Sequence, residues 1–367
     1  MNEDEIQLVA GIRPEAPPYD RQAKDAARRG LVASAASGGA PGRGAAWLRP
    51  LWRRPSTMVL AGALAVTVGA TAVVLVQARG RGPSGPVEEV VVAMPEIAAV
   101  SASEVLDRAA RAAAKTDLDP RDDQFVKVES ETMYGAFGED DDRNETRYLY
   151  RTRRAIWLSA DGTKNGVLRV EYLEPRAYPG WPIPEAAYEQ TGVATMPLVS
   201  CKTTPEYART DYAALKKLPT DAEGMRAHLY TGERGGNSRD EAAFTAAGHM
   251  LRETYLPPAQ RAALFKAVGT IPGVDVSENA EDAAGRRGIG VGRVGLDGVR
   301  KDLLFDPETY EFLGERGIVV DEKAARAPKG SLVASTAQLS VTVADELPST
   351  RPGFWDDLAD GCPTPAG

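Results

Sequence analysis

The chain has 367 residues, of which 43% are hydrophobic, so it is long enough for one large domain or two ordinary ones and can bury a core. Residues 1–57 carry nine basic and six acidic side chains, whereas residues 79–367 carry 35 basic and 46 acidic ones. This composition excludes a chain that is disordered throughout. The acidic surplus also argues against nucleic acid as a partner, because it repels polyphosphates.

Residues 1–57 are predicted to form a cytoplasmic, largely flexible arm. One helix is expected at residues 19–37, and the Gly-, Pro- and Ala-rich stretch at residues 37–46 is typical of a tether. The arm is too short to form a core alone, and its small basic surplus suits the anionic cytoplasmic face of a membrane.

Residues 58–78 are predicted to form a transmembrane helix that anchors the chain. These 21 residues contain no charged side chain, and at about 1.5 Å rise per residue they span about 30 Å of hydrocarbon. Four arginines closely precede the segment and two follow it. This distribution predicts a single-pass protein of the cell membrane, with its N-terminus in the cytoplasm and its C-terminus outside. A cleaved signal peptide and a buried core helix are the alternatives.

The segment after the anchor divides into a linker (79–100), one extracytoplasmic domain (101–345) and a Pro-rich tail (346–367). Ser101 and Glu104 form a capping box for a helix that runs to about Lys115. Aromatic and β-branched residues then predict strands, separated by a hairpin turn at residues 161–166. The expected strands are 124–134, 146–159 and 167–173, and the proline-dense residues 175–205 are expected to run over the surface.

A block of helices comes next. Capping boxes begin two of them, at Thr220 with Glu223 and at Ser238 with Glu241, and Pro257-Pro258 begins a third that stops at Gly269. The remaining residues predict strands at 274–277, 288–294, 299–305, 311–320 and 332–343. Because these strands lack crossover helices, we predict an α+β fold in which helices pack on an antiparallel sheet.

Residues Gly290 to Gly295 match the GxGxxG phosphate-binding pattern, which requires a helix directly after the motif. Here a turn at residues 296–298 and a further strand follow. We therefore interpret the glycines as marks of sheet twist, a bulge or close packing, and we predict no cofactor.

Residues 139–142, with Asn144 and Glu145, concentrate carboxylates in a loop between two strands. The spacing fails the EF-hand pattern, so a solvated hairpin tip is favoured over a calcium site. Arg151, Arg153 and Arg154 lie on one predicted strand, where a solvated face is favoured over an anionic head-group site.

Cys201 and Cys362 are the only cysteines, and they form either one disulfide or two unpaired thiols. His228 and His249 are the only histidines. No two of these residues lie at metal-ligand spacing, and no nucleophile and base occur in a recognisable order. We predict no metal site and no catalytic residues.

Several motifs resemble an actinobacterial family of single-pass membrane proteins without an established activity. They are residues 123–126, 218–221, 271–274, 282–286, 304–309 and 313–316. Genes of this family often lie near those of extracytoplasmic-function sigma factors, which implies envelope sensing or regulation. The predicted exterior is also loosely similar to lipoprotein-carrier and periplasmic sigma-regulator domains, which implies a curved sheet that holds acyl chains against helices. The arm lacks the His/Cys zinc motif of many anti-sigma domains, and the resemblance implies no site residues.

Three functions follow in order of support. The first is a membrane-anchored extracytoplasmic protein, not an enzyme, that binds or senses an apolar or envelope-derived ligand. The second is a regulatory partner of a sigma-factor system that acts through residues 1–40 of the arm. The third is an extracytoplasmic hydrolase.

Overall fold

The computed structural model describes residues 94–351, except 116, 141–142, 202–203 and 232–237, and also residues 354–355. All of them belong to one compact unit, Ser56–Gly367, while the second unit, Met1–Pro55, lies outside the described residues. The predicted arm, the anchor at residues 58–78 and most of the predicted tail are likewise outside them. None of the helices within the described ranges is both long and apolar enough to cross a membrane.

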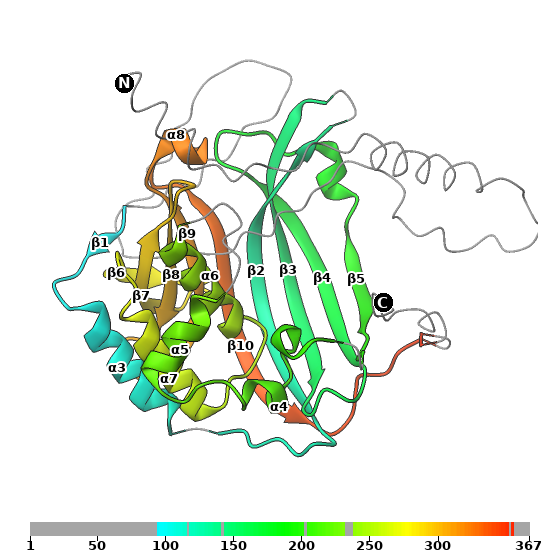
Figure 1. Ribbon diagram of the computed structural model, residues 1–367. Helices are drawn as coiled ribbons and strands as arrows, with labels where there is room; N and C mark the ends of the chain where they lie inside the picture. The colour runs from blue at the N-terminus through cyan, green and yellow to red at the C-terminus, as the bar shows by residue number, and fades with distance from the viewer. Residues whose placement is uncertain are drawn as a thin grey trace, which may run out of the picture. The chain divides into compact units, whose positions relative to one another are not determined.

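Ten strands of the described residues pair into one antiparallel sheet (Figure 1), in the order β1-β6-β7-β8-β9-β10-β2-β3-β4-β5. Their bounds are Glu96–Ile97 (β1), Phe125–Glu139 (β2), Glu145–Ser159 (β3), Gly166–Ala177 (β4), Gly192–Leu198 (β5), Asp275–Glu281 (β6), Arg287–Val294 (β7), Val299–Phe305 (β8), Phe312–Val319 (β9) and Leu332–Ala344 (β10). The predicted antiparallel α+β class is confirmed at this level.

The sheet consists of two meanders that the last strand joins. Strands β2 to β5 follow one another in space as they do in sequence, and so do β6 to β9. Strand β10 lies between the two sets and pairs with β9 on one side and with β2 on the other. A final strand was expected from the sequence, but its central position was not.

Strand β5 corrects the expectation for residues 175–205. These residues do not only run over the surface, because Gly192–Leu198 pairs with β4 along its length, with Pro197 opposite Val167. Strand β5 is at the edge of the sheet, so the missing N–H of Pro197 does not interrupt hydrogen bonding between two central strands. Proline density is therefore compatible with an edge strand.

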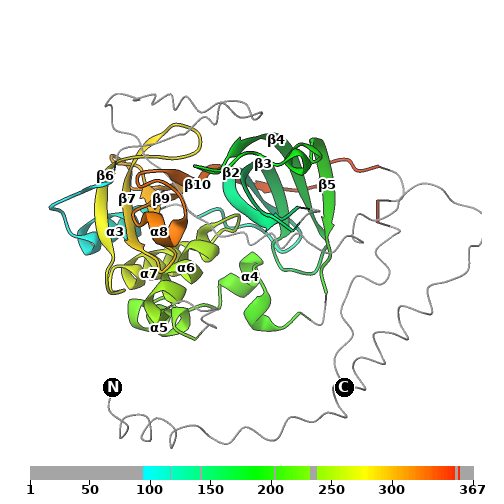
Figure 2. The same ribbon diagram turned by 90° about the horizontal axis from the view of Figure 1, so that it is seen from above.

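The helices group over the β6–β9 part of the sheet, as Figure 1 shows, and Figure 2 shows α5, α6 and α7 on one side of the strands. Their bounds are Ala102–Ala113 (α3), Tyr212–Leu215 (α4), Ala222–Leu229 (α5), Arg239–Leu251 (α6), Pro258–Val268 (α7) and Glu322–Ala325 (α8), with short 3-10 turns at Glu185–Tyr188 and Glu206–Ala208.

Three of the four predicted helix starts are confirmed. Ser101 and Ser238 accept hydrogen bonds from the third backbone N–H of α3 and α6, at 3.2 Å each, and Pro258 is the first residue of α7. The cap predicted at Thr220 is wrong by one residue. The Asp221 carboxylate caps α5 instead, at 2.8 Å from the Gly224 nitrogen, because a charged acceptor suits a helix N-terminus better than a hydroxyl does.

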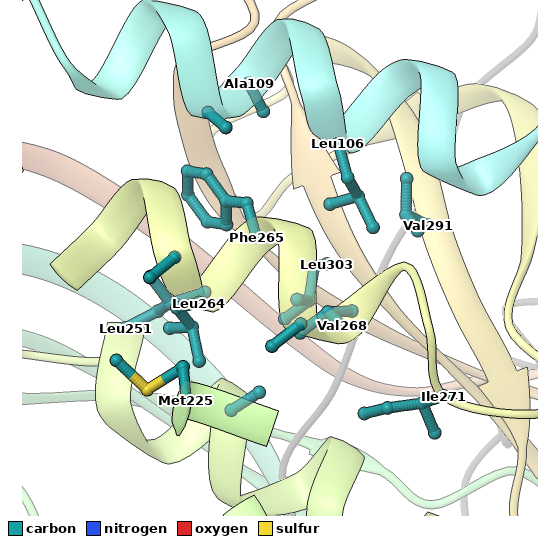
Figure 3. Packing of buried hydrophobic residues seen from close by; sticks show 14 of the residues in the cluster. Leu106, Ala109, Met225, Leu251, Leu264, Phe265, Val268, Ile271, Val291 and Leu303 are labelled. Carbon is teal, nitrogen blue, oxygen red and sulfur yellow. The ribbon is translucent and has the colours of Figure 1, made fainter. Parts of the chain in front are cut away.

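The main core lies between these helices and strands β6 to β8. Figure 3 shows Leu106 of α3 and Phe265 and Val268 of α7 converging on Val291 and Leu303 of the sheet. All five side chains are at most 1% exposed. The buried face of α3 is the one that meets α7.

Candidate ligand cavity and polar pocket

A cavity of about 230 Å³ lies between the helices and the sheet. Helix α3 contributes Ala109, Ala112 and Ala113 to its wall, and these short side chains leave the space open. The loop after α3, the end of α6 with the loop after it, helix α7, the β8–β9 turn with the start of β9, and β10 close the other sides. They contribute Leu118, Met250, Leu251, Thr254, Tyr255, Leu256, Arg261, Phe265, Tyr310, Glu311, Phe312, Gln338 and Val341.

The cavity has an apolar floor and a polar rim. Leu251, Leu256 and Phe265 are buried, whereas Glu311 is exposed, so the cavity reaches from the core towards the surface. At the rim, the Arg108 Nη1 donates to the Tyr310 hydroxyl at 2.7 Å. An apolar interior with a few polar groups at its edge is typical of a small-molecule site.

Two stacked tyrosines hold the loop that forms one wall. The rings of Tyr212 and Tyr255 lie 6.0 Å apart at an interplanar angle of 16°. The Tyr255 hydroxyl accepts from the Leu118 backbone nitrogen at 3.0 Å. Burial, together with the Asp117 carboxylate, raises the pKa of Tyr212 to about 12. Tyr212 therefore remains a neutral hydrogen-bond donor at physiological pH.

A small polar pocket of about 10 Å³ adjoins the cavity, and Phe312 and Gln338 line both spaces. Its other lining residues are Val128, Ser130, Thr132, Arg252, Glu253, Gly314, Glu315, Thr336 and Ala337. The pocket lies at the junction of β2, β9 and β10 with the end of α6.

Glu315 of β9 and Arg252 form an ion pair inside the pocket. The Glu315 Oε2 lies 2.9 Å from the Arg252 Nε and 2.8 Å from its Nη2, and Glu315 is 0% exposed. Burial raises the pKa of Glu315 while the Arg252 charge lowers it, and the net direction is upward. Burial also lowers the pKa of Arg252, but the Glu315 carboxylate raises it. The net direction is upward, so Arg252 keeps its charge.

The second pair joins the loop after α6 to β3. The Glu253 Oε2 accepts from the Arg154 Nη2, and the Glu253 Oε1 accepts from the Ser130 hydroxyl, at 2.9 Å each. Glu253 has φ +53°, a left-handed conformation that costs a residue other than glycine about 1 kcal/mol. The two carboxylate contacts offset that cost.

Arg154 corrects the interpretation of the basic run on β3. Arg153 does lie on the more exposed face, where it pairs with Glu131 and Glu171 of the neighbouring strands. Arg154 points the other way and contacts Glu253. The run is therefore not a single solvated face.

Gly290 and Gly292 of the GxGxxG pattern lie on β7, which turns directly into β8, as predicted, and Gly295 follows the strand. They provide room for a buried ion cluster. A Cβ at Gly292 would lie 2.3 Å from the Asp302 Oδ1, and one at Gly290 would lie 2.4 Å from the Ser277 hydroxyl. Asp302 pairs with Arg316 and, at 2.9 Å, with Arg300. This cluster points away from the cavity, because Asp302 precedes Leu303, which faces the helices.

Two of the family-like motifs are turns held by aspartates. Asp282 accepts from the Arg286 nitrogen at 2.9 Å, and the Arg286 Nη2 donates to the Gln338 carbonyl at 2.8 Å. Asp306 accepts from the backbone nitrogens of Glu308 and Thr309, at 2.9 and 2.7 Å. The second turn carries Tyr310 and Glu311 to the mouth of the cavity.

Of the remaining candidates, Asp140 and His228 lie outside the lining of both spaces, and His249 directly precedes Met250, which lines the cavity. Asp140 closes the β2–β3 hairpin by accepting from the Asn144 nitrogen at 2.8 Å, and residues 141–142 are outside the described residues. His228 lies on α5 and His249 on α6, and within the described ranges no three His, Cys, Asp or Glu side chains gather as metal ligands.

Cys201 follows β5 and is half-buried. Cys362 lies outside the described residues. The bridge between these two cysteines therefore stays a prediction.

The chain matches no protein-family model, no curated protein and no solved structure. Function is therefore inferred from the cavity and the polar pocket themselves. Sequence reasoning identified neither of them, because Arg252 and Glu315 are 63 residues apart. The available signal was a charged pair, Glu315-Arg316, in the middle of an otherwise apolar strand.

Proposed function

We propose that this chain is a membrane-anchored extracytoplasmic binding or sensing protein that takes up an apolar or amphiphilic ligand from the cell envelope. The observation that carries the proposal is the cavity of about 230 Å³ between α3, α7 and the sheet. Protein interiors are normally close-packed, so a space of this size with an apolar floor is a candidate binding site.

The size and lining of the cavity favour a slender ligand. Small-molecule sites usually measure about 300–1,000 Å³, so this cavity suits a short alkyl chain or the end of a longer one. Helices that pack on one side of an antiparallel sheet are also the arrangement expected for a lipoprotein-carrier-like domain, and this agreement supports the likeness proposed from the sequence.

A cavity-filling variant tests the proposal. The full chain is purified in mild conditions and analysed by native mass spectrometry, which is expected to detect a bound apolar molecule. Ala112→Leu should reduce its occupancy at least about fivefold, because the new side chain occupies the cavity that Ala112 lines. Ala114→Leu is the matched control, since Ala114 is exposed and outside the lining.

Two outcomes would count against binding in this cavity. One is ligand-free protein in repeated preparations, including preparations to which octanol has been added. The other is equal occupancy in the Ala112→Leu variant and its Ala114→Leu control. Either result would leave the cavity as a packing defect between α3 and the sheet.

The anchor and the orientation belong to the same proposal. Residues 58–78 would hold the chain in the membrane with the domain outside, as their apolar length and flanking arginines suggest. In intact cells, added protease should then cleave the C-terminal portion, while an epitope tag at the N-terminus remains protected until the cells are lysed. Full protection of the C-terminal portion would contradict this topology.

A further inference from the structure

We propose that the polar pocket beside the cavity binds the head of the ligand, by accepting a hydrogen bond from one uncharged donor group, such as a hydroxyl, at the Glu315 Oε1. The inference rests on the proposed function, because it assigns the tail of the same ligand to the cavity. It adds a chemical class: a neutral amphiphile with a hydrogen-bond donor at its head.

The acceptor is an oxygen atom of a buried carboxylate. Glu315 is 0% exposed and uses its Oε2 for Arg252, whereas its Oε1 has no hydrogen-bond partner among the described residues. A buried carboxylate oxygen accepts hydrogen bonds and is unfavourable without a donor. The protein holds this oxygen in place through close contact with α6, where a Cβ at Gly248 would lie only 2.6 Å from it.

The charges of the pocket match an uncharged head. Arg252 pairs with Glu315, and Arg154 pairs with Glu253, so two arginines balance two glutamates. An ionic head would enter this interior without a counter-charge, which burial penalises strongly. A neutral donor adds a hydrogen bond and leaves both ion pairs intact.

The size and position of the pocket fit one small group. Its volume of about 10 Å³ is roughly that of a single water-sized sphere. The pocket borders the cavity at Phe312 and Gln338, which line both. In the proposed complex, the hydroxyl at the end of a chain that occupies the cavity passes these two side chains to reach Glu315.

Tyr134 is a second group with unused hydrogen-bonding capacity at this place. The Arg252 guanidinium lies 5.5 Å from the centre of the Tyr134 ring, and the buried Tyr134 hydroxyl has no hydrogen-bond partner within the described part of the chain. Tyr134 lies beside Arg252 rather than in the lining of the pocket, and in the proposed complex the ligand hydroxyl that donates to Glu315 also accepts from Tyr134. Glu315 and Tyr134 together would then favour a hydroxyl, which both donates and accepts a hydrogen bond, over a head group that only accepts one.

The test uses the full chain in lipid nanodiscs and a photoreactive analogue of octanol that carries a diazirine on its chain. Peptides labelled on illumination are identified by mass spectrometry, which separates labelling of the cavity from labelling of the membrane. We expect labels in peptides that contain residues 109–113 or 250–256. Octanol should compete at a concentration about fivefold lower than octyl methyl ether does, because the ether lacks the donor.

Three variants test which side chains cause the preference for octanol over the ether. Tyr134→Phe and Glu315→Gln should each reduce the fivefold ratio to about twofold or less while labelling persists. Tyr134→Phe keeps the ring under Arg252 and both ion pairs, so it serves even where Glu315→Gln fails to fold. Tyr172→Phe removes a hydroxyl from β4, which contributes no residue to the lining of the pocket, whereas β2, the strand of Tyr134, contributes three; this control should leave the ratio unchanged.

The results separate this inference from the proposed function. Equal competition by octanol and the ether, with labels in the cavity, would overturn the head-group assignment and preserve the binding cavity. A fivefold preference that survives both pocket variants would overturn the assignment to Glu315 and Tyr134. Labelling of the membrane segment alone would overturn both proposals.

Discussion

Gly248 of α6 is the residue on which the position of Glu315 depends most directly. Glycine inside a helix costs about 1 kcal/mol relative to alanine, so its presence there calls for a physical reason. The reason is the close approach of the buried carboxylate, which a Cβ would meet at 2.6 Å. The glycine makes α6 intrinsically less stable, but it leaves room for the Glu315 carboxylate in the polar pocket.

We predict that Gly248→Ala lowers the free energy of unfolding by about 1–3 kcal/mol, although alanine is the better helix former. The added methyl group would displace Glu315 from its contact with Arg252. Urea unfolding of the full chain, followed by circular dichroism, measures the change. Gly269→Ala is the control: Gly269 ends α7 at φ −62°, where a Cβ has ordinary contacts from 3.4 Å outwards, so its stability should be unchanged or slightly higher. Equal effects of the two changes would contradict the prediction.

Single residues also explain why the site was not visible in the sequence. Glu315 and Arg316 are adjacent, yet they point to opposite faces of β9, one to Arg252 and the other to Asp302. Burial lowers the pKa of Arg316, and Asp302 opposes that shift. A strand pattern indicates that two charged residues separate in this way, but only the tertiary fold supplies their partners.

At the level of elements, an arginine joins the α8 turn to the β2–β3 hairpin. Arg147 of β3 lies over the rings of Phe137, Tyr178 and Trp181, at 5.1, 5.5 and 5.0 Å from their centres. Its Nη1 donates to the Ala325 carbonyl at 3.1 Å. One planar side chain therefore links the β2–β3 hairpin to residues 178–181 and to α8.

Arg147→Lys should lower the free energy of unfolding by about 1–2 kcal/mol, because lysine cannot stack on the three rings and reach the carbonyl at once. Hydrogen exchange should increase first around residues 322–330, since α8 loses its contact with the hairpin. Arg169→Lys, an exposed change on β4, is the control and should have no effect. Unchanged exchange near α8 would show that other contacts hold this turn.

Elements with local signals were predicted well. Ser238 caps α6 and Pro258 is the first residue of α7. Strands β3, β7 and β8 begin within one residue of the expected positions. These signals are local, because helix caps and turns depend on residues that are adjacent in the sequence. Strand β5 was missed because the density of prolines in residues 175–205 was interpreted as the mark of a surface segment. The order of the strands was not predicted, since pairing across the sheet depends on contacts between residues far apart in the sequence.

At the level of the whole molecule, β10 makes one sheet out of two meanders. Ala337 is fully buried and lies opposite Glu131 of β2. Residues Leu332 to Ser335 pair with β9. A substitution that disrupts β10 should therefore destabilise strands on both sides of it, including β8 and β3, which do not pair with β10.

We predict that Ala337→Pro destabilises the described unit by about 3 kcal/mol or more, because proline removes a ladder hydrogen bond and fixes φ in a central strand. Hydrogen exchange followed by mass spectrometry should show β2–β4 and β7–β9 losing protection together. Leu339→Ala is the control, since Leu339 is exposed and lies at the bulge between Gln338 and Ser340. Loss of protection in only one meander would show that the two halves fold independently.

The central position of β10 also has a consequence for biosynthesis. Residues 332–344 leave the ribosome after every other strand of the sheet, yet β2 and β9 both need them as a partner. Until then each meander presents an unpaired strand edge, which is a template for mispairing between chains. Nascent chains should therefore require protection by chaperones until the last strand emerges, and a chain truncated before residue 332 should carry two meanders with unpaired edges and aggregate rather than fold as a smaller domain.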